Sequence, residues 1–91
     1  VPTIYGHAGN GHPHMDFVAR NTEQVHAIEE TIAAILRPIL AMGGTVAAEH
    51  GIGKIKHRWM GMQLSAQQRA VMQGIKRALD PQGLMAPGNI F

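Results

Sequence analysis

The sequence predicts a small α+β domain in which helices pack on a short sheet. Two segments show the three-and-four spacing of apolar residues that is typical of an amphipathic helix, and a β-leaning run precedes each of them. The expected order is therefore strand, helix, strand, helix. With 91 residues and 45% hydrophobic content, the chain can bury one core of modest size. Because it begins at Val1 without an initiator methionine or a preceding turn, we expect it to be a piece of a longer protein.

The first predicted helix covers residues 23–41. Its apolar residues recur three and four positions apart and form one stripe: Val25, Ile28, Ile32, Ile35, Leu36, Ile39 and Leu40. Asn21 is expected to cap the first turn, with Gln24 at the capping-box position, and Gly43 and Gly44 supply a left-handed exit. Pro38 removes a backbone donor, so the last turn is expected to kink or to end early.

The second predicted helix covers residues 66–79. Ser65 and Gln68 form a capping box, and Asp80-Pro81 is expected to end the helix. Its expected buried stripe consists of Val71, Ile75, Ala78 and Leu79. The expected strands are Ile4–Tyr5, His14–Val18 and Thr45–Ala48.

Composition and charge argue against several classes of protein. The chain has no cysteine, so it cannot form a disulfide framework or a thiolate metal site, and we expect a cytoplasmic location. No apolar run is long enough for a membrane span, and no signal-peptide pattern is present. The net charge is only +2, and the densest basic group, Lys54, Lys56 and Arg58, has little aromatic interleaving. Nucleic acid is therefore not an expected partner.

Three histidines lie in the stretch GHAGNGHPHMDF, residues 6–17. On a regular strand, His12 and His14 point to the same face and could bind one metal ion. His7 would point to the other face, but Gly9 and Gly11 allow a bulge or loop that brings it round to His14. The spacing alone leaves the liganding pair undecided, and the histidines could also simply line a polar loop.

Glu49 and His50 form a second group that could carry chemistry. They close the third β-leaning run and are followed by Gly51 and Gly53. The carboxylate could serve as an oxygen ligand and the imidazole as a general base, although an exposed turn would have the same composition.

Three segments together resemble a known family: GHAGNGHPH, GGTVAAEHGIG and DPQGLMAPGNIF. They are similar to the C-terminal end of FAD-linked oxidases of the vanillyl-alcohol oxidase superfamily, in the branch of glycolate oxidase, D-lactate dehydrogenase and D-2-hydroxyglutarate dehydrogenase. The resemblance spans nearly the whole chain. It implies that residues 1–91 are a C-terminal fragment of a ferredoxin-like cap or substrate domain.

The resemblance also implies the site. His7, His14 and Glu49 would be the metal ligands and His50 the catalytic base. The cofactors would be a divalent metal, for which zinc suits the ligands best and manganese or iron is compatible, and FAD. A domain of the same protein outside this sequence would bind the FAD, and the substrate would be a small 2-hydroxy acid. The fragment alone is then expected to be inactive.

The sequence departs from the family pattern at three positions. His12 stands where the family usually has asparagine, and Asn10 stands where it has aspartate, which could alter metal affinity. Ala86 replaces an asparagine before Pro87. Asp16 would lie near the substrate, where its charge opposes a carboxylate, so the identity of the substrate stays open.

Two other classes of function compete with an oxidoreductase. One is a small non-enzymatic metal- or anion-binding module that uses the histidines and the basic group. The other is a subdomain whose histidines only support packing. For an isolated cap fragment we expect exposed apolar surface and self-association, with Trp59, Met60, Met62 and Ile90-Phe91 as candidates.

Overall fold

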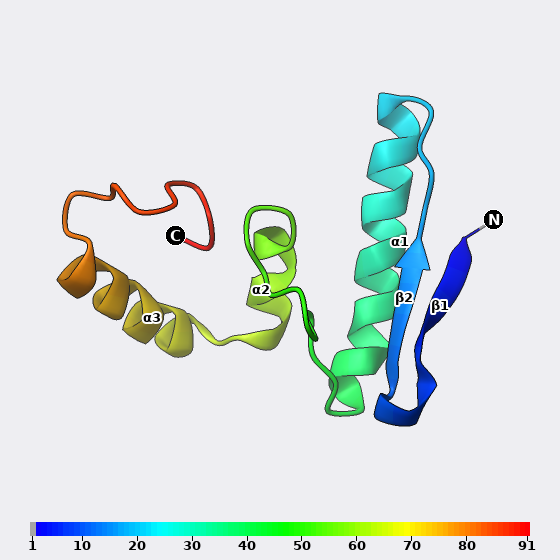
Figure 1. Ribbon diagram of the computed structural model, residues 1–91, viewed down its shortest axis with the longest axis horizontal. Helices are drawn as coiled ribbons and strands as arrows, with labels where there is room; N and C mark the ends of the chain where they lie inside the picture. Colours follow the sequence, from blue (N-terminus) through cyan, green and yellow to red (C-terminus); the bar gives the residue numbers. More distant parts are fainter. Residues whose placement is uncertain (1) are drawn as a thin grey trace. The chain divides into compact units, whose positions relative to one another are not determined.

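The computed structural model describes residues 2–91, and over this range it has a small α+β structure (Figure 1). A single antiparallel sheet of two strands, β1 (Thr3–His7) and β2 (His12–Asp16), precedes three α-helices. The helices are α1 (Thr22–Ala41), α2 (His57–Gln63) and α3 (Ala66–Leu79). The predicted α+β class is confirmed, although the two strands are consecutive and form a hairpin instead of flanking a helix.

The hairpin is closed by a three-residue 3-10 turn, η1 (Ala8–Asn10). Gly11 ends this turn in the left-handed conformation, with φ of 62°, and its N–H donates to the Ala8 carbonyl at 3.1 Å. Gly6 lies within β1 at φ of 140°, and a Cβ at this position would collide with the His12 carbonyl oxygen. These two glycines let the strands turn sharply and approach closely just before the histidine-rich segment.

The caps of α1 agree closely with the sequence prediction. The Asn21 side chain accepts a hydrogen bond from the Gln24 N–H at 2.9 Å, while the Gln24 side chain accepts from the N–H of Arg20 at 2.8 Å, one residue earlier than predicted. At the other end, the N–H of Gly44 donates to the Ile39 carbonyl at 2.9 Å. The glycine exit is therefore confirmed.

Pro38 lies inside α1, and the helix continues to Ala41, the end predicted from its periodicity; of the two expected effects of Pro38, the early end does not occur. Proline removes only its own N–H from the helical ladder. The last turn is still closed by the Met42 N–H, which donates to the Pro38 carbonyl at 3.1 Å, and by the glycine exit.

The predicted strand Thr45–Ala48 does not form, and this prediction is wrong. The Thr45 hydroxyl donates to the Ala47 carbonyl at 2.8 Å, which bends the segment locally, and the Val46 N–H donates to the Gln63 side chain at 2.9 Å. A side chain from α2 therefore satisfies the amide that a neighbouring strand would have bonded. The intrinsic preference of these residues for a strand is overridden by their local partners.

The chain divides into two compact units, Val1–Ile35 and Leu36–Phe91. In the second unit, three apolar side chains are buried: Leu36, Val46 and Met60. Met60 is only 2% exposed, so the expectation that it belongs to an exposed apolar surface is wrong. Trp59, Ile90 and Phe91 are half-buried, whereas Met62 is exposed as expected.

The predicted capping box and end of α3 are confirmed, but its stripe is not buried. Ser65 and Gln68 form both reciprocal hydrogen bonds, and the helix ends at Leu79. Val71, Ile75 and Leu79 are nevertheless 60%, 56% and 78% exposed, so the prediction that they face the core is wrong for this chain. None of the helices between residues 2 and 91 is long and apolar enough to span a lipid bilayer.

Candidate functional site

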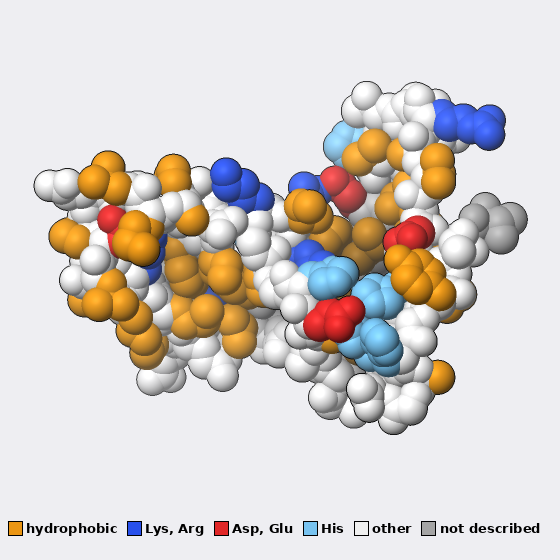
Figure 2. Space-filling view, viewed as in Figure 1, with side chains coloured by type: hydrophobic (Ala, Val, Ile, Leu, Met, Phe, Trp, Pro, Cys, Tyr) orange, Lys and Arg blue, Asp and Glu red, His pale blue; other side chains and the backbone are white. Residues whose placement is uncertain are grey.

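One face of the β1–β2 hairpin carries mainly polar side chains. Residues that pair across an antiparallel sheet project to the same face, and along each strand every second residue projects to that face. The observed register therefore places six side chains together: Thr3 with Asp16, Tyr5 with His14, and His7 with His12. Figure 2 shows histidine side chains gathered on the surface of the hairpin. The opposite face carries Ile4, Gly6, Pro13 and Met15.

This hairpin brings His7 and His14 together. Their ring centroids are 6.3 Å apart, and each ring offers a nitrogen within 4.8 Å of a nitrogen of the other. His7 is exposed and His14 is half-buried. The spacing predicted opposite faces for a regular strand, but the turn at Ala8–Gly11 restarts the alternation, so both rings lie on one face.

His12 joins the same face. Its ring centroid lies 5.6 Å from that of His7, directly across the hairpin, and 4.9 Å from that of His14. Alternation along β2 had predicted the shared face of His12 and His14, and this geometry is confirmed. The two alternative histidine pairs of the sequence analysis are thus parts of one three-imidazole cluster.

Tyr5 is a residue of this face that the sequence analysis missed. Its ring stacks on His14 with centroids 5.0 Å apart and an interplanar angle of 16°. The charge of Asp16, together with a hydrogen bond between the two side chains, raises the pKa of the Tyr5 hydroxyl above its ordinary value. The stacked ring restricts the orientations open to the His14 imidazole. The alternation of Tyr5 with His7 in the sequence could have revealed it.

Glu49 and His50 lie on an exposed, irregular loop of the second unit. Glu49 Oε1 lies 3.6 Å from His50 Nε2, and the two side chains are 47% and 67% exposed. Gly51 and Gly53 have φ of 73° and 56°, a left-handed conformation that side chains rarely adopt. This loop presents a carboxylate and an imidazole to the surroundings, where they can act as ligand and base.

The structure shows the backbone conformation at two of the positions that depart from the family pattern, Asn10 and Ala86. Asn10 ends the exposed 3-10 turn of the hairpin. Ala86 has φ of 46°, the one described residue other than glycine with a positive φ. Asparagine tolerates this conformation better than alanine does, which is a backbone reason for asparagine at that position.

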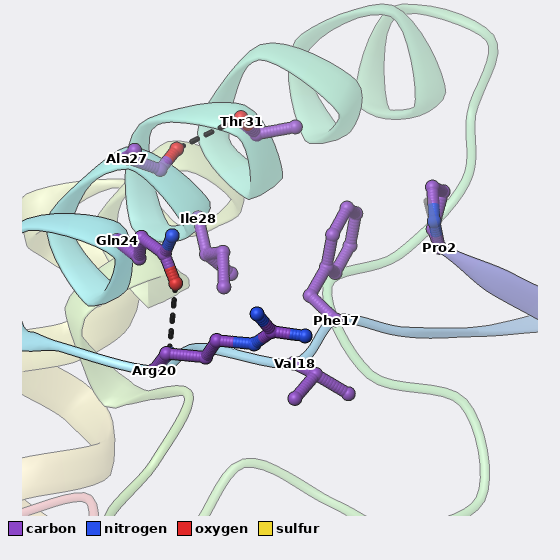
Figure 3. Close-up of a pocket in the computed structure, with 8 residues that line it drawn as sticks. All are labelled: Pro2, Phe17, Val18, Arg20, Gln24, Ala27, Ile28 and Thr31. Carbon is purple, nitrogen blue, oxygen red and sulfur yellow. Dashed lines mark hydrogen bonds between the residues drawn. The ribbon is translucent and has the colours of Figure 1, made fainter.

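A hollow of about 620 Å³ lies within the first unit, where Phe17 projects toward α1 (Figure 3). It is lined by Pro2, Phe17, Val18, Arg20, Gln24, Ala27, Ile28 and Thr31. Its walls are about equally polar and apolar, and Arg20 contributes one guanidinium. None of the histidines of the hairpin lines it.

Comparison with known proteins identifies relatives of this chain. The family described as "FAD linked oxidases, C-terminal domain" matches residues 1–90. The glycolate oxidase subunit GlcD of Bacillus subtilis is 34% identical over 96% of this chain and 19% of its own length. The D-2-hydroxyglutarate dehydrogenase of Xanthomonas citri is 32% identical over 96% of this chain and 19% of its own length.

A probable mitochondrial D-lactate dehydrogenase of Danio rerio is 36% identical over 97% of this chain and 18% of its own length. The chain thus spans about a fifth of the length of these relatives. No solved structure matches it. Since the family matches all but the last residue, the chain belongs to the FAD-linked oxidases and corresponds to their C-terminal domain.

Proposed function

We propose that this chain is the metal- and substrate-handling part of a flavin-dependent 2-hydroxy acid dehydrogenase or oxidase. Family membership supports the link to FAD, and the relatives are named for glycolate, D-lactate and D-2-hydroxyglutarate, all of which are 2-hydroxy acids. FAD would be bound mainly by another domain of the same protein. The isolated chain is then expected to bind no FAD and to have no activity.

In this proposal His7, His14 and Glu49 hold a divalent metal ion. The observation that carries it is the pair of imidazoles on the hairpin, whose nitrogens lie within 4.8 Å of each other. Two neutral imidazoles and one carboxylate fit the ligand preferences of zinc, and also accommodate manganese or iron. A site with three protein ligands leaves a position open for the substrate.

His50 would act as the general base. The substrate hydroxyl gives its proton to the imidazole of His50, and the hydrogen on the same carbon leaves with its electron pair, so that the hydroxy acid becomes a keto acid. The metal would lower the pKa of the substrate hydroxyl and hold the substrate oxygens in place. FAD, when bound, accepts the hydride. The exposure of His50 on a glycine-flanked loop supports a role in which it reaches a substrate.

Replacing His50 with alanine in the flavoprotein that contains this chain tests the base. We expect kcat to fall by about 10²–10⁴-fold, the usual range for removal of a general base, while the metal content stays unchanged. His26→Ala is a matched control, because its side chain lies on α1 and is 72% exposed. A His50→Ala variant as active as His26→Ala would assign the base to another residue.

A further inference from the structure

The imidazole rings of His7, His12 and His14 form one cluster on the hairpin. Their ring centroids are separated by 4.9, 5.6 and 6.3 Å. All three project from one face of β1 and β2, since His7 pairs directly with His12, and His14 follows two residues later. The three rings are therefore carried by one local element, the hairpin with its short turn.

From this geometry we infer that His12 is a further ligand of the metal ion held by His7 and His14. The inference rests on the proposed function, because it adds a residue to the same site. It gives the hairpin three nitrogen donors. His12 occupies a position where the family usually has asparagine, so the third nitrogen is a property of this chain.

Two of the three ring separations are close to those of imidazoles that bind a common ion. An imidazole nitrogen lies about 2.0–2.1 Å from zinc, which puts the ring centre about 3.2 Å from the metal. The centres of two rings on one ion are then about 4.5–5.2 Å apart at right or tetrahedral angles, and up to about 6.4 Å at wider angles. The two separations that involve His12, 4.9 and 5.6 Å, are close to the tetrahedral value, whereas the 6.3 Å between His7 and His14 must shorten by side-chain rotation before one ion can bind all three rings.

The backbone keeps His12 in reach. Pro13 stands between His12 and His14; its ring fixes its own φ and restricts the backbone of His12, which precedes it. Gly11, in the left-handed conformation, delivers the chain into β2 directly at His12. With few backbone conformations open to it, the cluster loses little conformational entropy on binding an ion.

A third imidazole changes which ions are preferred. Imidazole suits zinc, copper and nickel, whereas carboxylate and water suit manganese and magnesium. His12 is therefore expected to bias this site toward zinc and away from manganese. His12→Asn, which restores the residue usual in the family, should weaken zinc binding by at least about tenfold, since even partners outside the ligand shell contribute this much.

The test counts nitrogens. We would load the flavoprotein with Cu²⁺ and measure electron spin-echo modulation, because the depth of the modulation from remote ring nitrogens reports the number of bound imidazoles. We expect three imidazoles in the unmodified protein and two in His12→Asn, with His12→Gln as a second variant of different shape. His26→Asn, on α1, should leave the count unchanged.

Two imidazoles in the unmodified protein, with no change in either His12 variant, would overturn the inference. His7→Ala separates this result from failure of the proposed function. If His7→Ala lowers the count and the His12 variants do not, the metal site stands without His12. If His7→Ala leaves the count unchanged, the proposed metal site itself is wrong.

Discussion

At the scale of single residues, Gly6 determines whether the hairpin can form. A Cβ at this position would collide with the His12 carbonyl oxygen and would lie 3.1 Å from the backbone nitrogen of His14. The φ of 140° is also unfavourable for residues other than glycine. We expect Gly6→Ala to destabilise the hairpin by about 1–3 kcal/mol, the usual range for backbone strain. Hydrogen exchange of the β1 and β2 amides should report the faster local opening.

Gly9 provides the matched control for this prediction. It lies in the same hairpin turn, and a Cβ there would meet no heavy atom within 4 Å. Gly9→Ala should leave the exchange rates nearly unchanged. Equal exchange in the Gly6→Ala and Gly9→Ala variants would show that close packing at Gly6 does not hold the hairpin.

Asp80 ties the segment after α3 to the helix end. It accepts hydrogen bonds from Lys76 at 2.5 Å and from the backbone N–H groups of Met85 and Leu84 at 2.9 Å. These hydrogen bonds lower the pKa of Asp80 from 3.8 to about 2, and the bond from Lys76 has the largest effect. The stabilisation is therefore fully present above pH 3.8 and is lost as the pH falls through about 2.

A carboxyl-carbon NMR titration should find the midpoint of Asp80 near this low value. Exchange of the Leu84 and Met85 amides should accelerate over the same pH range, because protonation of Asp80 weakens both bonds. In Asp80→Asn this acid-dependent step should be absent. A midpoint of Asp80 at the ordinary value for aspartate would contradict the role of these hydrogen bonds.

At the scale of elements, periodicity and capping chemistry were sufficient to predict α1 and α3. Both helices begin at the predicted caps, because Asn21 and Ser65 satisfy N–H groups locally and need no tertiary partner. The seven-residue α2 was not predicted, since HRWMGMQ is too short for a periodic pattern. Thr45–Ala48 was misassigned because its amide partner, the Gln63 side chain, is distant in sequence.

The candidate site was predictable only in part. The sequence showed which histidines are clustered, but the face of His7 depends on the length of the turn at Ala8–Gly11, which alternation along one strand does not encode. Tyr5 alternates with His7 along β1 and so shares its face, but its contact with His14 is made across the hairpin and depends on the turn. The roles of Glu49 and His50 came from the family resemblance and stay predictions.

The exposed side of α3 leads to a prediction for the isolated chain. Val71, Ile75 and Leu79 recur every fourth residue and are all more than half exposed. Figure 2 shows apolar side chains over the region of α3. Burial of such a stripe is favourable, so the isolated chain should self-associate. Ile75→Lys should shift sedimentation toward monomer, whereas Ala70→Lys, a change at an exposed position away from the stripe, should not. An unmodified chain that sediments as a monomer would contradict this prediction.

At the scale of the whole molecule, the chain accounts for about a fifth of its relatives' length. Its proposed contribution is a set of ligands and a base, with the flavin held elsewhere in the protein. Within this chain, a hairpin provides the imidazoles and a separate loop provides Glu49 and His50. The central claim is thus the proposal that His7, His14 and Glu49 hold one metal ion.

Elemental analysis of the purified flavoprotein tests this claim most directly. The unmodified protein and His26→Ala should each retain a divalent metal, and His7→Ala, His14→Ala and Glu49→Ala should each lose most of it, because each removes a ligand. Circular dichroism would verify that the variants remain folded. If folded His7→Ala, His14→Ala and Glu49→Ala proteins retain as much metal as His26→Ala, these residues do not form the metal site.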